Sequence, residues 1–172
     1  YSYLAMPMIE RLQAEHDAVA NMRIVRPIAV RIPGFFRQVN PLWPPYLARD
    51  CNRIAEINDI PYRWPRPDPI VQDMQTYKIA DEQPYIHRLT RLGVEAERGG
   101  HGIEFAREVS LLIFGGTRDW HLGDHLARAA LRAFRESRPA AYYEGIRRTF
   151  NDAGIDIYSY NASFEADITD DE

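Results

Sequence analysis

The stretch Tyr1-Ser2-Tyr3-Leu4-Ala5 leads directly into an amphipathic helix, and the interpretation of the whole chain starts from it. Apolar residues after it recur at helical spacing, and the residues between them are polar or charged. A small hydroxyl residue at a helix start lies where free N–H groups and the helix dipole stabilise anions, thiolates included. The sequence therefore predicts either a thiolate contact or a simple helix cap at Ser2.

The next segments are predicted from alternation and from proline content. Residues 23–32 alternate as a strand does, and we expect an edge position or a bulge at Pro27, which has no N–H to donate. A loop follows, and then a helix at about 46–58. Residues 61–69 carry four prolines in nine positions, which favours an extended segment close to polyproline II.

Helical periodicity dominates the chain beyond this extended segment. It predicts helices at about 81–98, 101–114 and 124–136. Glycine pairs at 99–100 and 115–116 are expected to end the first two of these helices. The pattern fits either an α/β domain with a helical insertion or a mostly helical fragment.

Composition and charge limit the classes of protein to which this chain can belong. The 172 residues are 45% hydrophobic and 27% charged, which is enough apolar material for a core. The net charge of −4 divides into −5 for residues 138–172 and +1 for residues 1–137. The arginines are dispersed and form no basic stripe, so nucleic acid is not expected as a partner. No apolar run reaches the roughly 20 residues of a membrane span, so no membrane partner is expected either.

Cysteine content bears on the redox setting. Cys51 is the only cysteine, so this sequence holds no internal disulfide, no C-x-x-C pair and no cysteine-rich zinc site. We expect no metal site, a buried position for Cys51 and a reduced, cytoplasmic setting.

Several short segments of the first 132 residues resemble one family. In order they are Tyr1-Ser2-Tyr3-Leu4-Ala5, Arg26-Pro27-Ile28, Asn40-Pro41, Tyr46-Leu47-Ala48-Arg49-Asp50, Ile60-Pro61-Tyr62-Arg63-Trp64-Pro65 and Gly123-Asp124-His125-Leu126-Ala127-Arg128-Ala129-Ala130. They are similar to motifs of 2-hydroxychromene-2-carboxylate isomerases and kappa-class glutathione transferases. The resemblance implies an α/β fold of the DsbA type, a thioredoxin-like domain with a helical insertion. We expect it to be mostly helical here and truncated at both ends.

The resemblance also implies where the chemistry lies. The family serine that binds the glutathione sulfur would lie two residues before Tyr1, and Ser2 matches the second serine of the motif. We therefore expect these 172 residues to be inactive alone. The family lysine that pairs with glutathione is replaced here by Trp43, Pro44 and Pro45.

The last residues resemble a different family. Residues 138–172 are similar to an early βα unit of xylose-isomerase-like TIM-barrel sugar phosphate isomerases, and they predict a helix at 140–153, a strand at 155–160 and a helix start at Thr169. We expect three parts: residues 1–60 from a thioredoxin-like domain without its first strand, residues 61–137 as a helical insertion, and residues 138–172 as a tail that is either a natural insertion or a foreign segment.

The function implied is glutathione-dependent cis–trans isomerisation of an aromatic degradation intermediate, with glutathione as cofactor and a homodimer as one possible assembly. Residues assigned to glutathione are Tyr1, Ser2 and Asn40, and residues assigned to the aromatic substrate are Trp43, Tyr62 and Trp64. For Asn40 the alternative is a bond to its own loop backbone, and for the three aromatic residues it is packing of the proline-rich loop. Alternative functions are a kappa-class transferase, a DsbA-family thiol–disulfide oxidoreductase and a non-catalytic helical interaction module.

Overall fold

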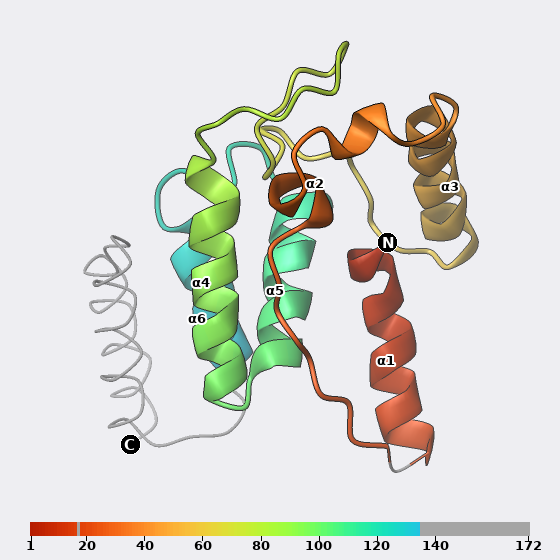
Figure 1. Ribbon diagram of the computed structural model, residues 1–172. Helices are drawn as coiled ribbons and strands as arrows, with labels where there is room; N and C mark the ends of the chain where they lie inside the picture. The colour runs from red at the N-terminus through yellow and green to blue at the C-terminus, as the bar shows by residue number, and fades with distance from the viewer. Residues whose placement is uncertain (17, 135–172) are drawn as a thin grey trace, which may run out of the picture.

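The computed structural model describes residues 1–16 and 18–134, and this part of the chain is mostly helical (Figure 1). Its elements are α1 (Ser2–His16), α2 (Ile28–Arg31), the short 3₁₀ helix η1 (Phe35–Arg37), α3 (Trp43–Ile57), α4 (Pro84–Arg98), α5 (Gly102–Phe114) and α6 (His125–Phe134). The described residues contain no strand, and one isolated bridge pairs Gln72 with Ile79. The expected helical character is confirmed, whereas the thioredoxin-like sheet stays a prediction.

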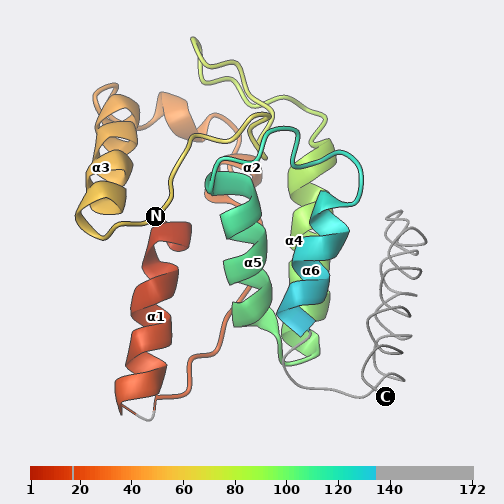
Figure 2. The ribbon, with the colours of Figure 1, turned by 180° about the vertical axis from the view of Figure 1, so that it is seen from behind.

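The main core lies among α4, α5 and α6, which pack side by side (Figures 1 and 2). Each helix turns an apolar face inward, and α6 does so with small residues: Ala129 and Ala130 are fully buried. Small side chains allow close approach of α6 to its neighbours. The largest fully buried side chain is Trp120, whose indole Nε1 donates a hydrogen bond of 2.8 Å to the carbonyl of Pro67.

A second, smaller core joins α1 to α3. It is formed by buried side chains from α1, α3 and the segment after α3: Tyr3, Leu4, Cys51, Ala55 and Tyr62. The phenol of Tyr3 donates to the carbonyl of Pro61 at 2.6 Å, which fixes the extended segment to α1. The buried position expected for Cys51 is confirmed.

Within the described residues, the predicted helices are confirmed, with shifts of a few residues at their ends. α3 begins at Trp43 rather than at about 46, because Pro44 and Pro45 occupy its first turn, where a missing N–H costs nothing. After α4, the N–H of Gly99 donates a hydrogen bond to the backbone carbonyl of Glu95, and Gly100 takes φ +82°. After α5, Gly116 takes φ +106°, so the glycine pairs end both helices.

The strand predicted at 23–32 is wrong. Residues 18–27 run extended without forming a ladder, and residues Ile28–Arg31 form the short helix α2. A strand needs a neighbour that accepts its N–H groups, and a carboxylate takes that role here. The N–H of Ile24 donates to Glu97 Oε2 at 2.9 Å, and Arg23 pairs with Glu97 Oε1 at 2.6 Å. Pro27 supplies the carbonyl that starts the turn of α2.

Other predictions are settled only in part. Residues 61–69 form no regular helix or strand, as expected. The predictions for 140–153, 155–160, Thr169 and the separate tail lie outside the described residues. Within the described part, no helix is both long and apolar enough to cross a membrane.

Candidate functional site

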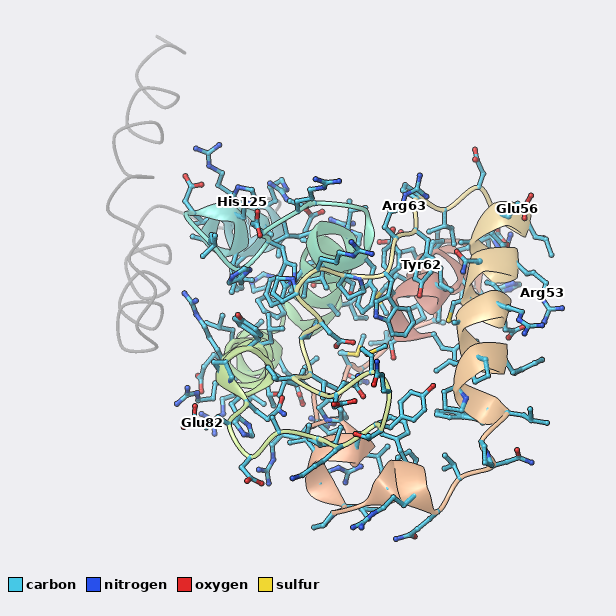
Figure 3. The ribbon with its side chains drawn as sticks, turned by 90° about the horizontal axis from the view of Figure 1, so that it is seen from above. Arg53, Glu56, Tyr62, Arg63, Glu82 and His125 are labelled. Atoms are coloured by element: carbon cyan, nitrogen blue, oxygen red, sulfur yellow. The ribbon has the colours of Figure 1, made fainter. Side chains whose placement is uncertain are left out.

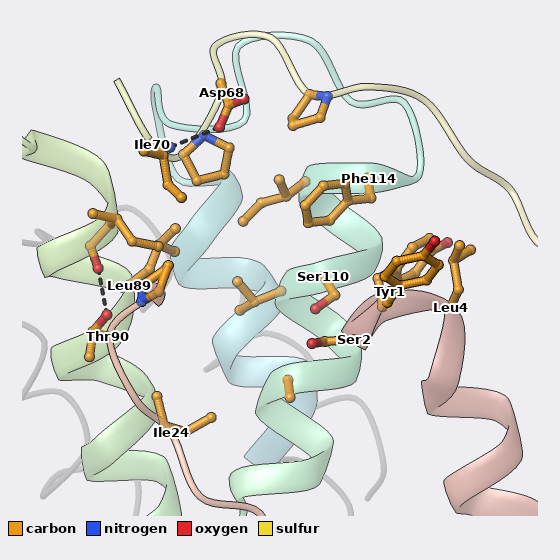
Figure 4. A pocket seen from close by; sticks show the side chains of 18 of the residues that line it. Tyr1, Ser2, Leu4, Ile24, Asp68, Ile70, Leu89, Thr90, Ser110 and Phe114 are labelled. Atoms are coloured by element: carbon orange, nitrogen blue, oxygen red, sulfur yellow. Dashed lines mark hydrogen bonds between the residues drawn. The ribbon is translucent and has the colours of Figure 1, made fainter. Parts of the chain in front are cut away.

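A cavity of about 540 Å³ opens beside the first turn of α1 (Figure 4). Its walls come from α1, from α4 and α5, from the extended residues before α2 and from the proline-rich segment after α3. Most of the side chains that line it are apolar or aromatic, and a few hydroxyl and charged groups interrupt them. Such a mixture is typical of small-molecule sites, where polar groups orient an otherwise apolar ligand.

Two serine hydroxyls face this cavity from neighbouring helices. Ser2 lies in the first turn of α1, and Ser110 lies on the facing side of α5 (Figure 4). Neither hydroxyl forms a hydrogen bond within the part of the chain that the structure describes, so Ser2 makes no capping bond there. The first N–H groups of α1 lie beside Ser2 and have no partner within the helix. Together these donors suit an anionic or strongly accepting ligand atom.

Stacked aromatic rings form one wall of the cavity. The ring of Phe114 stacks on Tyr3 with centroids 5.8 Å apart and on Tyr62 with centroids 6.3 Å apart. Tyr62 lies beside α1 when the molecule is seen from above, while Arg53 and Glu56 point outward from α3 (Figure 3). Burial, together with the neighbouring Cys51 thiol, raises the pKa of Tyr62, so its phenol stays protonated.

The phenol of Tyr1 is held at the rim of the cavity. It donates to Asp50 Oδ2 at 2.6 Å, and Arg53 pairs with the other oxygen of that carboxylate at 2.9 Å. The hydrogen bond to Asp50 raises the pKa of Tyr1 to about 12. The same bond, with Arg53, lowers the pKa of Asp50 below its ordinary value. Tyr1 is therefore positioned by α3 rather than free to contact a ligand from any angle.

Asp68 is the acid that lines the cavity. Its carboxylate accepts a hydrogen bond from the N–H of Ile70 at 2.9 Å and one from the Gln72 amide at 3.3 Å. Burial nevertheless raises the pKa of Asp68, because the charged form loses water on entering an apolar site. A carboxyl of this kind gives up or takes a proton closer to neutral pH than an exposed one does.

Four of the six residues assigned from the sequence line this cavity: Tyr1, Ser2, Tyr62 and Trp64. The other two lie outside it. Asn40 Oδ1 accepts from the N–H of Leu42 at 2.9 Å, which is the local loop bond named as its alternative role. Trp43 packs edge-on against Phe35, with centroids 6.5 Å apart.

Sequence reasoning missed Ser110 and Asp68. Ser110 interrupts the apolar face of the helix that carries Val109 and Ile113, and a hydroxyl there was a usable signal. Asp68 lies among the prolines of 61–69, where nothing in the local pattern indicates that the carboxyl becomes buried.

The residues present fit glutathione at its sulfur end. Ser2 and Ser110 offer donors without a partner in the described residues to a sulfur anion, and most of the surrounding wall is apolar. The carboxylates of glutathione would need a cation. The cation that lines the cavity is Arg23, which is exposed and already paired with Glu97. Among residues 1–16 and 18–134, no three or more His, Cys, Asp or Glu side chains gather to hold a metal ion.

Comparison with known proteins found no matching family model, no matching curated protein and no matching solved structure.

Proposed function

We propose that the cavity beside α1 binds the thiol end of glutathione together with a conjugated, aromatic small molecule, and that the protein is a glutathione-dependent cis–trans isomerase. The observation that carries the proposal is a pair of hydroxyls without a hydrogen bond in the described residues, Ser2 at the N-terminus of α1 and Ser110 facing it from α5, on an apolar cavity of about 540 Å³. Donors at such a place favour a thiolate over a thiol, and the thiolate is the reactive form.

The chemistry needs no redox partner. When bound, glutathione supplies a thiolate that adds to a conjugated alkene and leaves again after rotation about the resulting single bond. Ser2, Ser110 and the first N–H groups of α1 lower the pKa of the thiol. Tyr62 and Trp64 hold the flat substrate, and Asp68, whose pKa burial raises, lies in the same cavity.

The fold assignment belongs to the same proposal. We propose that these helices are the helical portion of a thioredoxin-like fold of the DsbA type. Its support is the resemblance of the short segments in residues 1–132, and the helical character of the described residues fits the helical portion of such a fold. A dithiol oxidoreductase has less support, since Cys51 is the only cysteine and is buried.

Binding of glutathione by the 172-residue chain tests the proposal directly. We expect isothermal titration calorimetry to show binding, and absorbance at 240 nm to show that the bound thiol ionises at lower pH than free glutathione. Ser2→Ala and Ser110→Ala should each weaken binding about tenfold, the worth of one hydrogen bond to a charged atom.

The matched control is Thr117→Val, which removes a hydroxyl that lies outside the cavity and leaves binding unchanged. Circular dichroism of each variant checks that the fold persists. Absence of binding at millimolar glutathione, or equal affinity in the two serine variants and the parent chain, contradicts the proposal.

A further inference from the structure

A second cavity, of about 680 Å³, shares no lining residue with the first, although neighbouring residues of the segments at 25–27 and 35–37 line the two. It is formed where α2 and η1 meet the loop of residues 76–81 and the first turns of α4 (Figure 1). Nothing in the proposed isomerase chemistry uses it.

Three permanent cations line this second cavity. Arg26 comes from the segment before α2, Arg37 from η1 and Lys78 from the loop. None of their charged groups forms an ion pair or a side-chain hydrogen bond within the described residues, although seven arginine–carboxylate pairs join other side chains of that same part of the chain. Asp81 is the acid in the lining, and His87 adds a further nitrogen donor. The cavity is therefore positively charged in a chain whose net charge is −4.

The backbone places one of these cations. Gly34 takes φ +68°, and a Cβ atom there would lie 2.7 Å from Arg37 Nη2. Because glycine has no Cβ, the guanidinium of Arg37 lies directly over Gly34. The guanidinium therefore lies against the backbone of Gly34, while Arg37 as a whole stays exposed to solvent.

The rest of the lining is apolar or already satisfied. Val30 and Ile79 contribute aliphatic surface, and Phe35 and Tyr77 contribute rings. The buried Gln83 amide already forms hydrogen bonds with the backbone of Val71 and Ala80, so few of its donors and acceptors remain for a ligand. An occupant therefore needs negative charge for the cations and an apolar, flat body for the walls.

We propose that the cavity formed by α2, η1 and the 76–81 loop binds a small organic anion, with its carboxylate or phosphate group at Arg26, Arg37 and Lys78. Guanidinium groups form paired, charge-assisted hydrogen bonds to both kinds of group. The rings and aliphatic side chains cover the apolar part of the same ligand.

The test uses 1-naphthoate and the uncharged 1-naphthamide, which share one shape, with the full 172-residue chain. Calorimetry should show binding of the anion and at least tenfold weaker binding of the amide. Backbone amide chemical shifts should move at Gly34 and Lys78 and stay fixed at Ser2 and Ser110, which separates this cavity from the first.

The decisive variant is Arg26→Gln/Arg37→Gln/Lys78→Gln, in which naphthoate binding should fall at least tenfold. A control with the same loss of charge is Arg11→Gln/Arg91→Gln/Arg118→Gln, whose exposed side chains line neither cavity, and it should bind as the parent does. Equal naphthoate affinity in the two triple variants overturns the proposal. Equal affinity of the parent for naphthoate, naphthamide and inorganic phosphate overturns it as well.

Discussion

Glu97 fixes the extended segment after α1 to the helical bundle. Its carboxylate accepts the N–H of Ile24 and pairs with Arg23, and these two contacts lower the pKa of Glu97 below its ordinary value of 4.5. A carboxyl whose pKa is lower when folded stabilises the folded chain fully above pH 4.5. That contribution is lost as pH falls through the lowered value.

We therefore predict that acid loosens this segment before it unfolds the bundle. Hydrogen exchange of the Ile24 amide, corrected for its intrinsic pH dependence, should accelerate between pH 6 and pH 3. In Glu97→Gln the amide should exchange quickly at both pH values. The matched control is Glu95→Gln, whose carboxylate pairs with Arg98 and does not contact the segment. Equal protection in Glu97→Gln and the parent at pH 6 contradicts the prediction.

The side chain of Trp120 is buried and forms one hydrogen bond, so a conservative substitution can test how much both contribute to stability. Its side chain is 1% exposed, and its indole donates to the Pro67 carbonyl at 2.8 Å. Trp120→Phe removes the donor and part of the ring, and we expect the free energy of unfolding to fall by about 1–3 kcal/mol. Trp43→Phe, at a ring that is 38% exposed, should change it by about 0.5 kcal/mol or less. Urea denaturation followed by circular dichroism measures both.

At the scale of elements, the sequence predicted the helices correctly where the signals that determine them lie within the segment itself. The helices at 84–98 and 102–114 follow from apolar spacing and from the glycines after them, and both signals lie within the segments themselves. The strand at 23–32 failed because a strand depends on a partner far away in the chain. Here the partner is the side-chain carboxylate of Glu97, more than 70 residues later, which accepts the N–H of Ile24 in place of a neighbouring strand.

In the candidate site, too, residues in locally recognisable segments differ from residues that join the site only through packing of distant segments. Ser2, Tyr62 and Trp64, which the sequence resemblance assigns to ligand binding, line one cavity, and each lies in a segment that resembles a family motif. Ser110 and Asp68 join them only through packing of distant helices and loops, which no short motif records.

The contact between α4 and the extended segment gives a prediction for two elements together. A Cβ at Gly93 would lie 2.9 Å from Ile24 Cγ2. Gly93→Ala normally gains about 1 kcal/mol in a helix interior, but here the new methyl group displaces Ile24. We expect no net gain in unfolding free energy from Gly93→Ala alone. In an Ile24→Ala background, where space is free, the same change should stabilise by about 1 kcal/mol. A gain of equal size in both backgrounds would show that the two elements do not meet.

For the whole molecule, one ring packs against both cores. Phe114, at the end of α5, packs against the bundle core and against the core shared by α1 and α3. Its stacking on Tyr3 and Tyr62 connects the first turn of α1, the aromatic wall of the first cavity and the bundle. Removing that ring should therefore affect the two cores unequally.

Phe114→Ala tests this coupling. Loss of a large aromatic side chain from a core costs about 3–5 kcal/mol when it is fully buried, and somewhat less for this half-buried ring. We expect hydrogen exchange measured by mass spectrometry to show α1 and α3 losing protection while α4 and α6 keep most of theirs, because the bundle retains its other buried contacts. Leu112→Ala, a change confined to the bundle core, should reverse that order. Uniform loss of protection in both variants would mean that the chain unfolds as one cooperative unit and that Phe114 is no boundary.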